Sequence, residues 1–84
     1  MSDTETQLLD AFAAALRRRR LVLGLSQEEM AAQAGVSMRY ISLLESRRHQ
    51  PSLKTIQKLC MVMGVTMAAF MAEVEAALPD PRQQ

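Results

Sequence analysis

The sequence predicts a compact all-α domain of five helices. Three observations support this fold class: apolar residues recur at helical spacing, capping residues precede the helices, and very short connections separate them. The chain has 84 residues, 49% of them hydrophobic, which suits one core and one domain. With only three glycines and three prolines, the composition favours helices over a fold with many turns.

A long first helix is predicted over residues 4–23. Leu8, Phe12 and Leu16 recur every four residues, which places them on one face. Gly24 is suited to end the helix, because glycine readily adopts the left-handed conformation found after a helix C-terminus. The last turns carry four consecutive arginines, which complement the negative end of the helix dipole. The first three of them, Arg17 to Arg19, are expected to form a solvated face, as is usual for a charge run.

Four shorter helices are predicted to follow, each preceded by a residue that can cap it. Ser26 and Glu29 have the spacing of a capping box at the start of the second helix. Ser37, Ser52 and Thr66 are suited to cap the next three. We expect a single domain over residues 1–78, with helices at 27–34, 38 to about 46, 53–63 and 67 to about 78, and a loose tail over 79–84.

The positive charge is concentrated in the middle of the chain. The formal net charge is only +1, but residues 17–58 carry nine Lys or Arg against three Glu. Residues 1–16 sum to −3 and residues 59–84 to −2, so the middle carries +6. A concentrated basic region is the electrostatic signature of a protein that binds phosphates.

Several other function classes are disfavoured by the residues present. Cys60 and His49 are the only cysteine and histidine, so we expect no metal site and no internal disulfide. No catalytic carboxylate pair or phosphate-binding glycine loop is present, so we expect neither an enzyme nor a cofactor. The apolar stretches are far shorter than a membrane span and no signal peptide is visible, so we expect a cytoplasmic protein without membrane contact.

The segment over about 27–46 carries the functional information. It contains two short helices joined by a turn at Gly35, which can adopt positive φ. Ala31 is small enough to let the second helix cross closely, and Ile41 and Leu44 can anchor that helix on the core. This pattern predicts a helix-turn-helix, whose second helix enters the major groove of DNA.

Further pieces of sequence accompany this turn on both sides. They are Leu16 with Arg20, Gly24 to Ala31, Gly35-Val36-Ser37, Tyr40-Ile41-Ser42, Leu44-Glu45, Pro51-Ser52-Leu53, Leu59, Gly64-Val65 and Phe70. Together they resemble the Cro/C1-type (XRE-like) helix-turn-helix family of phage repressors and small bacterial regulators. The resemblance implies a lambda-repressor-like DNA-binding domain that recognises a double-stranded operator, in a bacterial or phage-encoded protein.

The resemblance also implies roles for single residues. Gln27 falls where family members contact a phosphate and brace the reading helix, and Arg20 and Glu45 match a structural ion pair. Arg39 can donate two hydrogen bonds to guanine, whereas Met38 offers only apolar contact, for instance to a thymine methyl. The base-reading set is Ser37, Met38, Arg39, Ser42 and Leu43.

The basic loop after the reading helix is a second candidate for DNA contact. Arg47, Arg48 and His49 lie where a DNA backbone would pass, although a solvated loop is the alternative. Tyr40 either donates its hydroxyl to a phosphate or packs its ring against its own helix. The family usually has glycine at position 47, so Arg47 either strains the helix end or marks a differently shaped one.

We expect a homodimer, because one reading helix covers only a short site. The Met- and Ala-rich helix over 65–78 is the expected interface, with the reading helices about 34 Å apart. A phage-type repressor, a restriction–modification controller and an antitoxin with a separate protein partner all fit. An adaptor that kept the fold but lost DNA binding is the alternative; Arg39, Arg47 and Arg48 argue against it.

Overall fold

The computed structural model describes residues 4–79, which form five α-helices and contain no strand. The predicted all-α, five-helix fold is therefore confirmed. Residues 80–84, which make up most of the predicted tail, lie outside the described part of the chain. The helices are α1 (Thr4–Val22), α2 (Gln27–Ala34), α3 (Met38–Glu45), α4 (Leu53–Met63) and α5 (Met67–Ala76).

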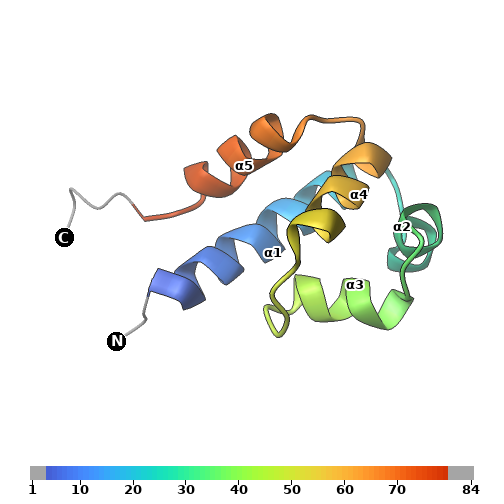
Figure 1. Ribbon diagram of the computed structural model, residues 1–84, viewed down its shortest axis with the longest axis horizontal. Helices are drawn as coiled ribbons and strands as arrows, with labels where there is room; N and C mark the ends of the chain where they lie inside the picture. Colours follow the sequence, from blue (N-terminus) through green and yellow to red (C-terminus); the bar gives the residue numbers. More distant parts are fainter. Residues whose placement is uncertain (1–3, 80–84) are drawn as a thin grey trace.

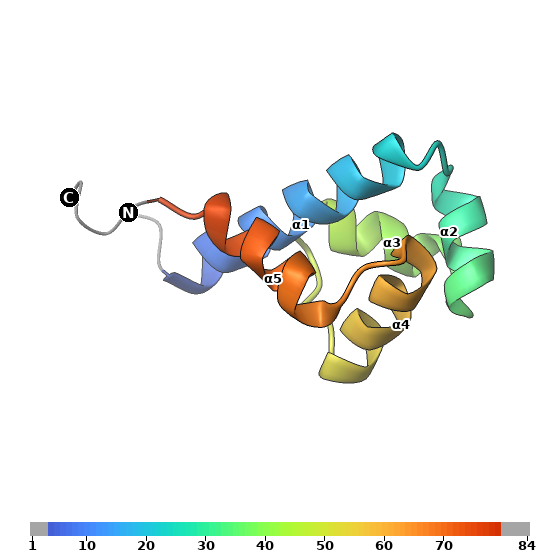
Figure 2. The same cartoon turned by 90° about the horizontal axis from the view of Figure 1, so that it is seen from above.

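The long helix α1 forms the axis on which the other helices are arranged (Figure 1). It packs against α3 on one side and against α5 on the other. α2 contacts both α3 and α4 at one end of the molecule, and α4 also contacts α5. The view from above shows the same order, with α3 behind α1 and α5 in front of it (Figure 2). The surfaces of α3 and α5 therefore face opposite ways.

The helices begin where the capping residues predict. The side chains of Ser26, Ser37, Ser52 and Thr66 each accept a hydrogen bond from a backbone N–H three residues later. Helix ends are less well predicted, since α1, α3 and α5 stop one or two residues earlier than expected. The frayed last turn of a helix carries little sequence signal, so such differences are common.

Four helices end in the same hydrogen-bonded geometry, and only three of them use glycine for it. Gly24, Gly35 and Gly64 follow α1, α2 and α4 with φ near +70°. Arg47 occupies the matching position after α3 with φ +68°. The N–H groups of Arg47 and Arg48 donate back to the last turn of α3, at 3.4 and 3.0 Å. Of the two possibilities at position 47, the structure therefore has the strained helix end.

The core is aliphatic with one aromatic pair at its centre. Phe12 of α1 and Phe70 of α5 meet edge to face, with ring centroids 5.7 Å apart. Cys60 is buried as expected of a core thiol, and burial raises its pKa. The large side chains that are almost wholly buried come from every helix: Leu16, Met30, Ile41, Leu44, Leu59, Phe70 and Val74.

Within residues 4–79, no single helix is long and apolar enough to cross a bilayer; α4 and α5 meet that test only as a pair bent by 99°. The same residues contain no cluster of three or more potential metal ligands.

Candidate nucleic-acid interface

A close crossing of α2 and α3 forms the helix-turn-helix. Ala31 lies at this crossing and is 2% exposed, so it is packed between the helices as its small side chain predicts. Gly35 adopts φ +73°, and the N–H of Val36 donates to the carbonyl of Ala31 at 3.0 Å. Ser37 then starts α3 directly, so the second helix leaves the turn in a defined direction.

α3 has one face in the core and the opposite face in solvent. Ile41 and Leu44 are 0% and 1% exposed and anchor the helix. On the outer side, Met38 is 51% exposed, and Arg39 forms no hydrogen bond or ion pair with any residue between 4 and 79. The structure thus brings the five predicted base-reading residues together: Ser37, Met38, Arg39 and Ser42 are exposed, and Leu43 is half-buried.

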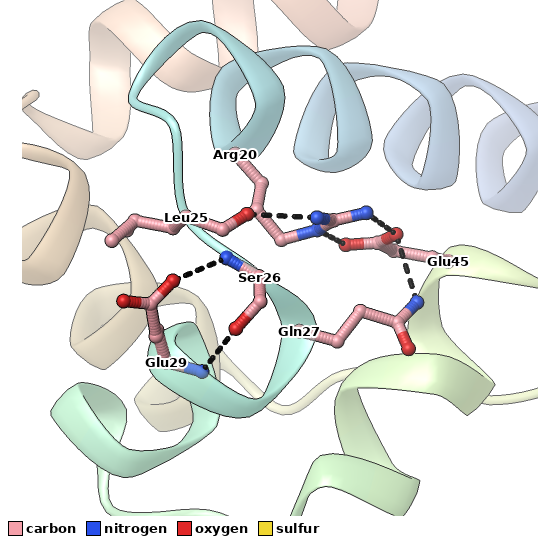
Figure 3. A network of polar contacts seen from close by, with 6 residues as sticks. All are labelled: Arg20, Leu25, Ser26, Gln27, Glu29 and Glu45. Carbon is pink, nitrogen blue, oxygen red and sulfur yellow. Dashed lines mark hydrogen bonds and ion pairs between the residues drawn. The ribbon is translucent and has the colours of Figure 1, made fainter.

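A buried ion pair at the C-terminal end of α3 is part of a network that joins this helix to α1 and α2 (Figure 3). Nε and Nη2 of Arg20 in α1 donate to the carboxylate of Glu45 in α3 at 2.7 and 2.9 Å. Nη1 of Arg20 donates to the carbonyl of Leu25 at 2.8 Å, and Nε2 of Gln27 in α2 donates to Glu45 at 3.2 Å. The hydrogen bonds that Arg20 donates to the Glu45 carboxylate raise the pKa of Arg20. The structure therefore unites Arg20, Glu45 and Gln27 in one network.

This network has an electrostatic consequence for the surface around α3. The Arg20 and Glu45 side chains are only 10% and 5% exposed, and they neutralise each other. A free carboxylate at position 45 would repel a nearby phosphate. The bidentate pair removes that repulsion and at the same time holds α3 in orientation.

The start of α2 is stabilised by the predicted capping box (Figure 3). The N–H of Glu29 donates to Oγ of Ser26 at 3.0 Å, and the N–H of Ser26 donates to the Glu29 carboxylate at 2.9 Å. That backbone donor lowers the pKa of Glu29. Gln27 is the first residue of α2, so the capping box also fixes the position from which the Gln27 side-chain amide extends.

The loop after α3 differs in part from what the sequence indicates. Arg47 lies 3.6 Å from the Asp10 carboxylate in an exposed pair. The side chain of Arg48 is exposed and forms no hydrogen bond or ion pair within the described part of the chain. Nothing in the local sequence indicates the contact with Asp10, because it depends on how α1 and α3 cross.

Tyr40 joins α3 to the start of α4. Its hydroxyl donates to Oγ1 of Thr55 at 3.4 Å, and its half-buried ring meets His49 edge to face with centroids 5.3 Å apart. The packing role left open for Tyr40 is thus present in the structure. Thr55 thus helps to orient the Tyr40 side chain, a role that the sequence analysis did not assign to it.

The four consecutive arginines of α1 do not form one solvated face. Arg20 is buried in the ion pair with Glu45 that the resemblance implies. The expected solvated face is wrong for Arg19, which is half-buried and donates through Nε to Glu73 of α5 at 2.9 Å. This contact lowers the pKa of Glu73. Arg17 and Arg18 are exposed.

Comparison with known proteins identifies the fold and family. The sequence model of the family described as Helix-turn-helix matches residues 16–70. The chain belongs to the Cro/C1-type helix-turn-helix family of transcriptional regulators. The matched range covers the C-terminal part of α1, the whole of α2, α3 and α4, and the start of α5.

Related sequences carry the same assignment. This helix-turn-helix regulator is 38% identical over 60 residues to an uncharacterized regulator, y4dJ, of Sinorhizobium fredii, covering 71% of this chain and 74% of the relative. It is 38% identical over 60 residues to the regulator DdrOP3 of Deinococcus deserti, again covering 71% of this chain. The matched residues span 46% of that second relative.

Solved structures show the same architecture. The clp gene regulator ClgR of Corynebacterium glutamicum superposes with a TM-score of 0.80 at 30% identity, covering 86% of this chain and 94% of that one. The restriction–modification controller protein C.AhdI of Aeromonas hydrophila gives a TM-score of 0.72 at 31% identity, covering 74% and 94%.

Proposed function

We propose that this helix-turn-helix regulator binds a short palindromic operator as a symmetric dimer, with α3 of each protomer in the major groove. One observation carries the proposal: the outer face of α3 is solvent-exposed and uncommitted, while its inner face is locked to the core. A reading helix needs both properties, because it must insert between two DNA backbones without deforming. Such DNA lies in the cytoplasm of a bacterium, which is where we place the protein's action.

Within α3, we assign sequence reading chiefly to Arg39. Its guanidinium has no protein partner within the described residues and can donate two parallel hydrogen bonds to O6 and N7 of guanine. Met38 contributes apolar contact to a thymine methyl, and Ser42 and Leu43 extend the surface along the groove. The Ser37 hydroxyl already accepts from the Tyr40 N–H, so it is left to contact DNA as a donor.

The flanking polar groups are assigned to the DNA backbone. Gln27 keeps one N–H of its amide for a phosphate while the other donates to Glu45. Arg47, Arg48 and His49 follow α3 and are exposed, so a phosphate can replace Asp10 as the partner of Arg47. Tyr40 contributes to these backbone contacts chiefly by packing its ring against His49 and so fixing the position of the imidazole.

We assign the dimer interface to α5 and the residues on either side of it, over 65–78. Its inner side carries the buried Phe70 and Val74, and its outer side is lined by small exposed residues: Ala68, Ala69, Ala72 and Ala76. Because α5 lies on the opposite side of α1 from α3, pairing through it leaves both reading faces open (Figure 1). A two-fold axis there would set two half-sites about 34 Å apart.

The regulated genes belong to one of several classes. The controller C.AhdI favours a regulator of restriction–modification type, since 94% of that protein superposes on 74% of this chain. A phage-type repressor and an antitoxin that acts with a separate protein partner fit the same site.

The experiment that tests the proposal is a selection of bound sites from a random DNA pool, followed by titration of Arg39→Ala. We expect a two-fold symmetric site. We also expect Arg39→Ala to lose about 1–3 kcal/mol of preference for it, with a smaller loss on random duplex DNA. Equal losses on both DNAs would show that Arg39 contacts phosphate only. An adaptor without DNA binding would enrich no site and show no salt-sensitive binding.

A further inference from the structure

Arg17 is a cation outside the helix-turn-helix whose side chain has no partner among the described residues. It lies in α1, three residues before Arg20, so the two side chains project from the same side of that helix. Arg20 is occupied by Glu45, and Arg19 by Glu73. Arg17 is exposed and forms no hydrogen bond or ion pair with any residue from 4 to 79.

The space in front of Arg17 is a polar hollow where α1, α2 and α3 meet. Its volume is about 210 Å³. A water molecule occupies about 30 Å³ in the liquid, so the hollow has room for a group larger than several waters. Because Arg20 and Glu45 neutralise each other, Arg17 gives the hollow its net positive charge. The lining residues are Arg17, Arg20, Gln27, Ser42, Glu45 and Ser46.

The hollow also contains neutral hydrogen-bond donors. Gln27 donates one N–H to Glu45 and has a second one left, and the exposed Ser42 hydroxyl has no partner in the described residues. The Ser46 hydroxyl donates to the carbonyl of Leu43 at 3.1 Å. One cation and two neutral donors around a small hollow are suited to an oxyanion. Ser42 belongs both to this hollow and to the outer face of α3.

We propose that this hollow receives one phosphate of the DNA backbone and that Arg17 is its charged ligand. The inference rests on the proposed function and adds a contact from α1, which lies outside the helix-turn-helix. A strand that flanks the major groove occupied by α3 passes the hollow because Ser42 connects the two surfaces. Arg17 would thereby fix how far α3 enters the groove, since α1 and α3 are joined by the Arg20–Glu45 pair.

Arg18 provides a matched control for Arg17. It is the next residue, equally exposed, and does not line the polar hollow. It borders a neighbouring groove of about 590 Å³, which Arg17 also lines together with Ala14, Leu21 and Val22 of α1. Arg17 and Arg18 therefore share that groove, and of the two only Arg17 lines the polar hollow. A diffuse attraction between α1 and DNA would use Arg17 and Arg18 equally, whereas a phosphate in the hollow would use Arg17 alone.

The test is the salt dependence of binding to a duplex of random sequence, measured for the wild type, Arg17→Ala, Arg18→Ala and Arg17→Lys. Losing one phosphate contact lowers the slope of log affinity against log salt by about 0.9. The advantage of the wild type over Arg17→Ala should therefore shrink about 3.5-fold between 50 and 200 mM salt. Arg18→Ala should keep the wild-type slope, and Arg17→Lys should restore most of it because the charge is retained.

A melting curve of each variant checks that the fold is intact, which the exposure of both side chains leads us to expect. An unchanged slope for Arg17→Ala, or an equal change for Arg18→Ala, would overturn the phosphate site. If Arg39→Ala still relaxes sequence preference in that case, the proposed function stands without this contact. A wild type that binds no DNA would overturn both.

Discussion

The four adjacent arginines of α1 show how much one residue's position matters. Successive residues of an α-helix are rotated by about 100°, so identical side chains point to different neighbours. Arg19 reaches α5, Arg20 reaches α3, and Arg17 and Arg18 remain in solvent. Composition alone treats these residues as one basic run, although one of them is the buried polar anchor of the reading helix.

We expect Glu45→Ala to destabilise the protein strongly. Removing one partner of a buried pair leaves the other charge without compensation, at a cost of about 3 kcal/mol. Urea denaturation at neutral pH would measure the loss. Asp10→Ala is the control, since its exposed pair with Arg47 should contribute at most about 1 kcal/mol.

A double replacement separates charge from packing at the same place. Combining Arg20→Met with Glu45→Leu removes both charges while keeping much of the buried volume. It should recover a large part of the stability lost in Glu45→Ala. If the double variant were as unstable as the single one, the pair would be stabilising through its hydrogen bonds to Leu25 and Gln27.

At the scale of the element, the end of α3 departs from the other helix ends. The three glycines that end α1, α2 and α4 adopt positive φ without a steric penalty, whereas Arg47 carries a Cβ in the same conformation. The cost is incurred next to the proposed DNA contact, which is consistent with a residue kept for its charge. Arg47 therefore lowers the folding stability of the protein but supplies a guanidinium at the edge of the reading helix.

Arg47→Gly should stabilise the folded protein by about 1 kcal/mol, because it relieves the left-handed strain. The same variant should bind DNA more weakly, since the charge is lost. Thermal unfolding and a DNA titration of one preparation would measure both. Arg48→Gly is the control: it removes the same charge at a residue outside the positive-φ set, so it should give no stabilisation.

For the whole molecule, the arrangement around α1 separates two surfaces. α3 faces one way and α5 the other, so a dimer through α5 can form without blocking DNA (Figure 2). The Arg19–Glu73 ion pair connects α1 to α5, and the Arg20–Glu45 pair connects α1 to α3. α1 thus transmits the position of the proposed dimer interface to the reading helix.

Ala72→Glu should weaken the dimer at least roughly tenfold, which corresponds to about 1.4 kcal/mol, because a carboxylate would be buried between two α5 helices. Sedimentation over a range of micromolar concentrations would detect the shift. Ala32→Glu, at an exposed position of α2, should leave the association unchanged. A wild type that stays monomeric at tens of micromolar would contradict the dimer itself.

Much of the fold was predictable because its signals are local. A serine or threonine before each of α2 to α5, and a glycine after three of the helices, mark boundaries within a few residues of sequence. The exposed face of α3 was predictable too, since Ile41 and Leu44 can point inward only if Arg39 and Ser42 point outward. The partners of Tyr40, Arg47 and Arg19 were not, because Thr55, Asp10 and Glu73 lie far along the chain.

By itself, the sequence determined which segments are helical, where they begin, and which side of the reading helix meets solvent. These properties follow from backbone capping and from a repeat of 3.6 residues, and both act over a single turn. Only the tertiary structure decided that, among the described residues, Arg19 is paired while Arg17 and Arg18 are not, that the end of α3 at Arg47 is strained, and where three helices enclose a polar hollow. Those outcomes depend on how helices cross, and a crossing is set by packing of the whole core.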